Sequence, residues 1–405
     1  MTLRRFASVL LLALGVLHAD NAPLRADAAD ELFNESAIQE IRLSINSRDL
    51  AQLRARFTEN TYYPADIRWN NTTVRNVGVR SRGTGSRRPD KMGLLVDMDR
   101  YARDQTFLGL SALVLDNMWQ DPALMKETLT MKVFRRMGQP APREAYCKLF
   151  INNEFQGLYS CVEPIDTKFA ARALGDSTGY LYEYHYRFPF FGEYLGDSFA
   201  PYKPIFEPQN HELESESTLY GPIRDLFREA NGPDDAVWLS RVDALIDLKQ
   251  FVTHVAIQGC IVDNDGILGA FGINNFYLHR PANSTRFRIL PWDEDFTFEF
   301  LDTSALRRGN SERDVPLFAR AFAQPELREA FINAEEQCAH AIGDDQWLLN
   351  EVDKIVNLIY PTVLQDTKKQ FSNDQFIEKL DFIRRIAVER PAILFQEVEN
   401  LRAGR

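Results

Sequence analysis

Two acidic segments flank a predicted β-hairpin in the second half of this chain. Their oxygen-bearing side chains include Asp263, Asp265, Asn275, Asp293 and Asp295. Between the segments, a Pro-Ala-Asn-Ser turn at residues 281–284 joins two stretches rich in aromatic and β-branched residues, which is the pattern of a hairpin. Because neighbouring strands lie about 4.8 Å apart, folding about this turn brings Asn275 to the same end of the hairpin as Asp293. An amide and several carboxylates that meet there outline a divalent-cation site, and such hard oxygen ligands favour Mg²⁺ or Mn²⁺.

A second explanation is that these residues only form turns. Asp and Asn gather in turns because their side chains bond local backbone, and the chain contains 58 acidic residues. However, Trp292 and Phe296 bracket the second acidic segment. Its carboxylates therefore enter an apolar setting, where an unpaired charge is costly. Taken together, the acidic side chains favour a functional site.

Length and composition indicate a folded protein with a large core. The chain has 405 residues, of which 45% are hydrophobic and 12% are aromatic, enough for two domains or one large bilobal domain. The net charge is −11, and no long basic run is present. General nucleic-acid binding is therefore not expected.

The N-terminus has the pattern of an export signal. Arg4 and Arg5 precede an apolar stretch at residues 6–17, which is too short to span a membrane, and small residues follow up to Ala28. We predict a signal peptide over residues 1–28 and no membrane span after its removal. The mature protein is then expected to be secreted or otherwise extracytoplasmic, in the periplasm or at the cell surface.

The remaining pattern predicts an α+β protein with a β-rich first half and a helical second half. Strand patterns occupy residues 67–69, 72–82, 93–98, 144–151 and 157–162. Helical patterns occupy residues 38–57, 121–137, 217–230, 236–239, 248–259, 315–341, 346–369, 373–385 and 391–401. Residues 180–210 are rich in aromatic residues and proline, and we expect an irregular loop there. The acidic hairpin lies at the seam between the two halves.

Four cysteines are present. Cys147 and Cys161 lie on the two arms of a predicted hairpin, in a register that places their thiols on opposite faces and disfavours a bridge. The sequence does not decide whether Cys260 and Cys338 are paired. No CxxC spacing indicates a metal site.

The arrangement of charged residues is typical of phosphoryl transfer. A Gly- and Arg-rich segment at residues 82–91 offers Arg82 and Lys91 as cations for phosphates. Downstream, one carboxylate orients a hydroxyl nucleophile, while others hold a metal ion against the phosphates. The segment at residues 82–91 is also compatible with an ordinary exposed basic loop. The glycine-rich motif of protein kinases and the Walker sequence are both absent.

These pieces, in this order, resemble the spore coat protein H (CotH) kinase family. The resemblance covers roughly residues 38–401. It is carried by residues 78–91, the helix near 121–138, the hairpin at 149–159 with Glu163 close behind, and the segment Trp292-Asp293-Glu294-Asp295. It implies an atypical, reduced protein-kinase-like bilobal fold that uses ATP with Mg²⁺ or Mn²⁺. The front lobe would span residues 35–165 and the back lobe residues 166–401.

The resemblance also implies roles for individual residues. Asp265 takes the catalytic role, and Asp263 stays as an alternative because residues 267–273 lengthen the gap to Asn275. The expected metal ligands are Asn275, Asp293 and Asp295. The expected nucleotide-binding residues are Arg82, Lys91, Glu163 and Trp292. Glu163 is assigned as a partner of Lys91 by analogy with kinases.

The implied function is that of a secreted atypical kinase that transfers phosphate from ATP to Ser or Thr hydroxyls of extracellular or coat proteins. Two departures keep other functions open. A glycine that often follows the tryptophan–aspartate motif is missing, and Gln209 stands where a lysine is common. The alternatives are a catalytically inactive scaffold of a surface assembly and a nucleotidyl transferase with the same metal site. The aromatic run at residues 188–191 is expected either to pack against a cleft or to form an exposed patch for a partner.

Overall fold

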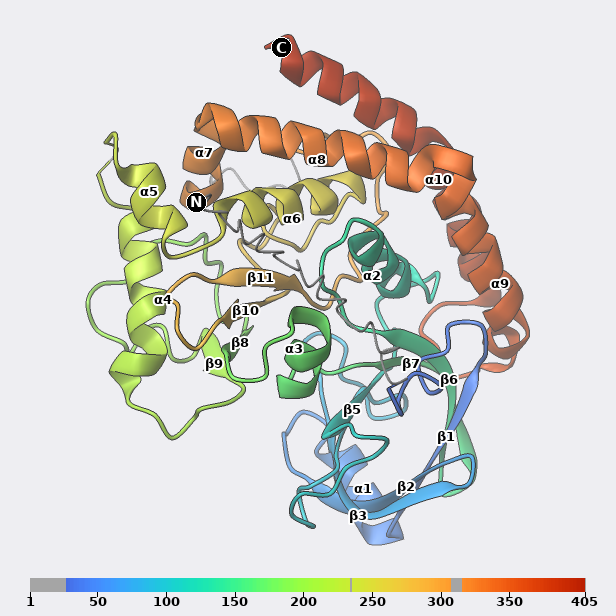
Figure 1. Ribbon diagram of the computed structural model, residues 1–405. Helices are drawn as coiled ribbons and strands as arrows, with labels where there is room; N and C mark the ends of the chain where they lie inside the picture. Colours follow the sequence, from blue (N-terminus) through green and yellow to red (C-terminus); the bar gives the residue numbers. More distant parts are fainter. Residues whose placement is uncertain (1–26, 234, 307–314, 405) are drawn as a thin grey trace, which may run out of the picture.

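The computed structural model describes residues 27–233, 235–306 and 315–404 (Figure 1). Most of the predicted signal peptide, residues 1–26, lies outside the described residues. The described chain forms a β-barrel, followed by a four-stranded sheet and a set of long helices. The predicted α+β class, with strands concentrated in the first half and helices in the second, is confirmed.

Seven strands of the first half close into a barrel in the order β1-β2-β3-β4-β5-β7-β6. They are β1 (Gln39–Ile45), β2 (Tyr63–Trp69), β3 (Thr72–Ser81), β4 (Leu94–Asp97), β5 (Ala112–Asp116), β6 (Glu144–Ile151) and β7 (Glu154–Val162). Parallel pairing of β1 with β6 closes the barrel, while the other neighbours are antiparallel. Closure leaves no unpaired edge among these seven described strands.

The predicted helix at residues 38–57 is wrong in its first part. The first residues form β1, and only α1 (Ser47–Ala55) is helical. Ile41, Leu43 and Ile45 are buried while the residues between them are more exposed, which is the period of two of a half-buried strand. Charged residues between these apolar positions resemble the polar face of a helix, and only pairing with β2 and β6 decides for a strand.

The predicted hairpin of β6 and β7 forms, but with a different register. Cys147 lies opposite Tyr159, and Cys161 lies opposite Ala145, because the register shifts between Leu149 and Phe150. The expectation that the two thiols lie on opposite faces was therefore wrong. Both cysteines belong to the buried apolar core of the barrel, and they are not disulfide-bonded.

The second sheet has the order β11-β10-β8-β9. Its strands are β8 (Tyr180–Tyr184), β9 (Phe206–Pro208), β10 (Phe276–Arg280) and β11 (Arg288–Pro291). β8 and β9 lie within residues 180–210, so the expectation of an irregular loop there was wrong at both of its ends. The predicted acidic hairpin is confirmed as β10 and β11, with Phe276 opposite Pro291 and the expected turn between them.

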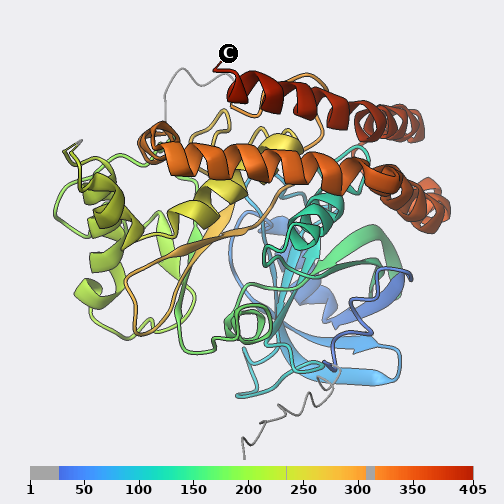
Figure 2. The ribbon, with the colours of Figure 1, turned by 45° about the horizontal axis from the view of Figure 1, so that its top comes forward.

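Helices cover the second sheet and one side of the barrel (Figures 1 and 2). They are α2 (Lys126–Arg136), α3 (Thr167–Leu174), α4 (Glu216–Ala230), α5 (Trp238–Asp243), α6 (Leu248–Cys260), α7 (Pro316–Ala323), α8 (Pro325–Gly343), α9 (Trp347–Gln365) and α10 (Asn373–Arg402). α8 packs on α6 and α10, and α9 contacts β7 of the barrel. A disulfide joins Cys260 of α6 to Cys338 of α8, with their Cα atoms 6.3 Å apart. No helix in the described ranges is long and apolar enough to cross a membrane.

Candidate active site

The β10–β11 hairpin brings the two acidic segments together at one end. Asn275 directly precedes β10, and Trp292 directly follows β11. The backbone N–H of Trp292 donates to the carbonyl oxygen of Asn275 at 3.3 Å. Asp293 therefore follows Trp292 at the same end of the hairpin as Asn275, as the sequence pattern indicates.

Two amide side chains hold the carboxylate of Asp265. Nδ2 of Asn274 donates to Oδ1 at 3.0 Å, and Nδ2 of Asn275 donates to Oδ2 at 3.0 Å. Burial, together with the charges of Asp263 and Asp293, raises the pKa of Asp265 to about 7, while the two amides oppose the shift. A fixed carboxyl group with a pKa near neutrality is suited to accept a proton from a substrate.

Asp263, the alternative catalytic residue, is part of the support beneath Asp265. Its Oδ1 accepts the backbone N–H of Asp265 at 2.8 Å, and its side chain is 1% exposed. Glu294 is completely buried beside it, and burial followed by the charge of Asp263 raises the pKa of Glu294 well above its usual range. Gln258 donates to Glu294 at 2.9 Å and accepts the backbone N–H of Ile267 at 3.0 Å. Asp265 is the more accessible of the two aspartates, which favours it for contact with a substrate.

Asp293 and Asp295 are both half-buried in an environment rich in negative charge. Burial raises the pKa of Asp293 to about 6, with Arg82 opposing the shift and Asp116 adding to it. Burial and then Asp293 raise the pKa of Asp295 well above its usual range, while Lys126 opposes. The charge of Asp293 therefore disfavours ionisation of Asp295.

Three further acids join this cluster, and sequence reasoning missed them. Asp116 ends β5, Glu127 lies in the first turn of α2, and Glu144 begins β6. Burial raises the pKa of Glu127 well above its usual range, and Glu144 and Asp116 are the next largest causes. A narrow cavity is lined by Asp116, Met118, Asp121, Met125, Glu127, Thr128, Glu144, Ser160 and Asp295. These acids come from segments far apart in the chain, so no local sequence motif identifies them as parts of one cluster.

Asp121 sets the start of α2 and thereby the position of Glu127. Its carboxylate accepts the backbone N–H groups of Ala123, Met125 and Lys126. The predicted helix was expected to begin at this residue, but the chain makes a capped turn first and the helix begins at Lys126. Such caps satisfy the free N–H groups of a helix N-terminus.

Arg82 is the predicted cation that reaches the acidic cluster. Its Nη1 lies 3.3 Å from Oδ2 of Asp116, and its guanidinium carbon lies 5.5 Å from the centre of the Trp292 ring. Asp293 is the second of the charges that raise the pKa of Arg82 against the effect of burial. Trp292 is 7% exposed and packs edge-on against Tyr277, with ring centres 5.3 Å apart. Arg82 and Trp292 thus lie together at the hairpin end.

The predicted pairing of Lys91 with Glu163 is wrong. Nζ of Lys91 lies 2.7 Å from Oδ2 of Asp366, and neither side chain has any exposed surface. The same Asp366 atom accepts the backbone N–H of Leu158, in the middle of β7. Glu163 lies beyond the end of that strand, about 17 Å farther along an extended chain. The structure does not bring the ammonium of Lys91 to a surface where it would contact a nucleotide.

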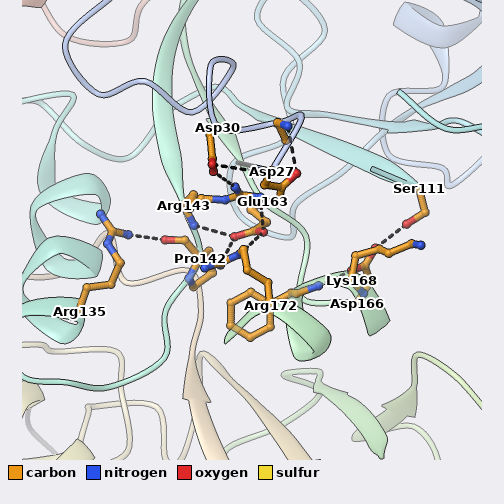
Figure 3. A network of polar contacts seen from close by, with 12 residues as sticks. Asp27, Asp30, Ser111, Arg135, Pro142, Arg143, Glu163, Asp166, Lys168 and Arg172 are labelled. Atoms are coloured by element: carbon orange, nitrogen blue, oxygen red, sulfur yellow. Dashed lines mark hydrogen bonds and ion pairs between the residues drawn. The ribbon is translucent and has the colours of Figure 1, made fainter. Parts of the chain in front are cut away.

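Glu163 belongs to a different network (Figure 3). It accepts from the guanidinium of Arg143 at 2.8 Å and pairs with Arg172 of α3. Arg143 also pairs with Asp27 and Asp30 of the N-terminal segment. Glu163 therefore anchors the chain between β7 and α3.

A second group of potential metal ligands lies on β8 and β9. Ligand atoms of Glu183, His185 and Glu207 all lie within 4.8 Å of one another. Glu183 and Glu207 are directly opposite in the strand pair, and His185 already pairs with Glu207. Among the residues that the structure describes, no three of the aspartates 263, 265, 293 and 295 come as close together. Of the predicted metal ligands, Asn275 and Asp293 lie at the same end of the hairpin, and the charge of Asp293 acts on Asp295.

The model of the CotH kinase protein family matches residues 79–394, most of the chain. The chain belongs to the CotH kinase family. It is 21% identical over 356 residues to the inner spore coat protein H of Bacillus subtilis (strain 168), which covers 86% of this chain and 94% of the relative.

Among solved structures, the proinflammatory kinase CtkA of Helicobacter pylori aligns with 76% of this chain and 95% of its own. The TM-score is 0.34 and the identity is 10%, so this likeness supports no further conclusion about the CotH family member described here.

Proposed function

We propose that this CotH family member is an exported atypical protein kinase with a bilobal, kinase-like arrangement of front and back lobes. It transfers the terminal phosphate of ATP to Ser or Thr hydroxyls of proteins outside the cytoplasm. The observation that carries this proposal is the fixed carboxylate of Asp265, which has a pKa of about 7 and is influenced by the charge of Asp293. Membership of the CotH kinase family supports the same reaction class.

Asp265 is the residue that accepts the proton of the attacking hydroxyl. Each of its oxygens receives one amide N–H, and a carboxylate oxygen has a further lone pair for the substrate. The two amides fix the carboxylate plane, so no reorientation is needed when the proton moves. Its pKa of about 7 lets it be ionised at neutral pH and still bind the transferred proton.

The acidic cluster fits a divalent cation. The charge of Asp116 raises the pKa of Glu127, Asp293 and Asp295, and the charge of Asp293 raises the pKa of Glu127 and Asp295, which is the behaviour of carboxylates with too few nearby positive charges. Asn275, Asp293 and Asp295 would hold Mg²⁺ or Mn²⁺ here. Such an ion would neutralise charge on the phosphates of ATP. Nδ2 of Asn275 donates to Asp265, so its carbonyl oxygen is the atom left for an ion.

Arg82 and Trp292 are assigned to the nucleotide. Arg82 offers a guanidinium group near Asp293, where phosphate would approach the metal side of the site. The Trp292 ring offers an apolar surface beside it. Lys91 is not assigned to this role because it is buried against Asp366.

Export is supported by two independent features. The N-terminal sequence has the pattern of a signal peptide, and the disulfide between Cys260 and Cys338 is typical of proteins that leave the reducing cytoplasm. The substrate would then be a protein of the same compartment.

The test is phosphate transfer by the purified protein. With ATP and MnCl₂ or MgCl₂ we expect radiolabelled phosphate in casein or in the protein itself, and intact-mass analysis should identify the added group. Asp265→Asn should lower the rate by roughly a hundredfold or more, since a general base contributes about that much. Asp353→Asn, at a half-buried aspartate of α9 paired with Arg384, is the matched control and should keep the wild-type rate.

Three results would contradict the proposal. Unchanged transfer by Asp265→Asn would remove the assigned base. Addition of AMP instead of phosphate would make the protein a nucleotidyl transferase. No transfer, together with no thermal stabilisation at millimolar ATP and metal, would favour a scaffold.

A further inference from the structure

Two phenylalanines are exposed next to the loop that carries Asp265. Phe188 is 44% exposed and Phe271 is 47% exposed. The half-buried ring of Tyr186 packs edge-on against Phe271, with centres 6.3 Å apart. We call Tyr186, Phe188 and Phe271 the aromatic patch. Large apolar side chains held at a surface in this way often mark a binding site.

Backbone contacts anchor the aromatic patch to the core. The backbone N–H of Ile273 donates to the carbonyl oxygen of Phe190 at 2.8 Å, and Phe190 is 1% exposed. A Cβ atom on Gly272 would lie 2.3 Å from that same oxygen, and φ of Gly272 is +91°, so the close approach requires glycine. The loops that carry Phe188 and Phe271 are therefore joined directly to each other.

The same loop packs against the backbone of Asp265. The backbone N–H of Ala270 donates to the carbonyl oxygen of Asn264 at 2.9 Å. A Cβ atom on Gly269 would lie 2.8 Å from Cα of Asp265. Phe271 is two residues beyond Gly269, which corresponds to at most about 7 Å of extended chain. The patch thus begins beside the proposed catalytic residue.

We propose that the aromatic patch binds an aromatic or large aliphatic side chain of the substrate polypeptide, a few residues from the hydroxyl that is phosphorylated. This inference rests on the proposed function. A Ser or Thr that reaches Asp265 carries its flanking residues across the adjoining surface, and there an apolar side chain would cover Phe188 and Phe271. The residues between Asp265 and Asn275 then determine specificity.

The size of the aromatic patch favours a single side chain over a second copy of this protein. Three rings, each less than half exposed, offer much less than the roughly 800 Å² that each partner contributes to a stable protein–protein interface. An apolar side chain of a flexible substrate needs only a small surface of this kind, fixed in place by the core.

The experiment uses peptides with one central serine in an alanine- and glycine-rich background. Phe, Leu or Ala is placed at each position from four residues before the serine to four residues after it. We expect the wild-type protein, with ATP and MnCl₂, to prefer Phe or Leu over Ala at one or two positions by about tenfold in kcat/KM. In Phe188→Ser, Phe271→Ser and the double variant, the ratio of kcat/KM for the Phe or Leu peptide to that for the Ala peptide should fall toward one. Melting curves show whether each variant is folded.

Val388→Ser is the matched control, because Val388 is an apolar residue of α10 that is 61% exposed. It should keep the wild-type ratio. Phosphorylation of all peptides without an apolar preference would overturn the inference and leave the proposed function intact. A concentration-dependent dimer in sedimentation that disappears in the double variant would also overturn it, because a second copy would then cover the patch. Phosphate transfer to no peptide or protein would overturn the proposed function and this inference together.

Discussion

At the scale of single residues, both acidic segments contain residues in unfavourable backbone conformations. Asn275 and Asp293 have φ of 59° and 57°, in the left-handed region that Asn and Asp tolerate better than most residues. Val262, just before Asp263, has φ of 55°, which is strained for a β-branched residue. Strain of this kind at both acidic segments is typical of functional sites, where the surrounding structure maintains it.

We predict that removing the charge of Asp293 stabilises the folded protein. Its pKa is about 6 in the folded protein, against an ordinary value of 3.8. The folded state therefore binds more protons than the unfolded state between these values, so stability falls as pH rises from about 4 to 6. Above pH 6, Asp293 is ionised in both states, and the full destabilisation by its buried charge is present. Asp293→Asn should raise Tm at pH 7.5 in EDTA by about 1–3 °C, and should change it little at pH 4.

Differential scanning fluorimetry at both pH values, with and without MnCl₂, is the measurement. The wild-type protein should gain stability from Mn²⁺ at pH 7.5, and Asp293→Asn should gain less. A lower Tm of the variant in EDTA at pH 7.5 would show that the Asp293 charge stabilises the fold through Arg82 instead of opposing it.

At the scale of elements, local patterns predicted most strands and helices, whereas tertiary contacts determine the residues at which they begin and end. The β10–β11 hairpin follows from its turn and its aromatic strands. Separate helical patterns were predicted at residues 373–385 and 391–401, but α10 runs through both of them. Arg390, next to Pro391, donates to the carbonyl oxygens of Gly259 and Cys260. Packing of this buried side chain outweighs the backbone hydrogen bond that a proline removes.

Asp366, just after α9, ties this helix to the barrel. Its carboxylate accepts Nζ of Lys91 and the backbone N–H groups of Leu158 and Lys368. Burial lowers the pKa of Lys91, and the charge of Asp366 opposes that shift. A Cβ atom on Gly157 would lie 2.4 Å from Oδ2 of Asp366, so the close approach depends on glycine.

We predict a large loss of stability when either partner of the buried Lys91–Asp366 pair is removed. Lys91→Met and Asp366→Asn should each lower the free energy of unfolding by roughly 3–5 kcal/mol, because each leaves the other group buried without its partner. The double variant should lose less than the sum of the two single losses. Urea unfolding of all three variants is the measurement. Additive losses would mean that Lys91 and Asp366 contribute independently of each other.

At the scale of the whole molecule, the second half is held together behind the proposed catalytic loop. Cys260 ends α6 shortly before Asp263, and its disulfide to Cys338 fastens this end to α8. α10 packs on the other side of α8. The loop with Asp265 therefore starts from a cross-linked and densely packed support.

We predict that the stability of the protein depends on whether the Cys260–Cys338 disulfide is oxidised or reduced. The two cysteines are 78 residues apart in sequence, and closing a loop of that length corresponds to about 4.5 kcal/mol in the chain-entropy model. Dithiothreitol should lower the Tm of the wild-type protein. The Cys260→Ser/Cys338→Ser double variant should start lower and show no response to the reductant. Equal responses of both proteins would assign the effect to something other than this bond.

The α+β class, the acidic hairpin and the meeting of Asn275 with Asp293 could all be predicted from the order of residues, because they follow from turn chemistry and from strand and helix periodicity over short stretches. Which distant charges share a site depends on the packing of the folded chain. This packing added Asp116, Glu127 and Glu144 to the acidic cluster, moved Lys91 to Asp366 and Glu163 to Arg143, and paired Cys260 with Cys338. The physical reason is that a charge interacts with whatever packing brings near it, and the order of residues along the chain does not encode that distance locally.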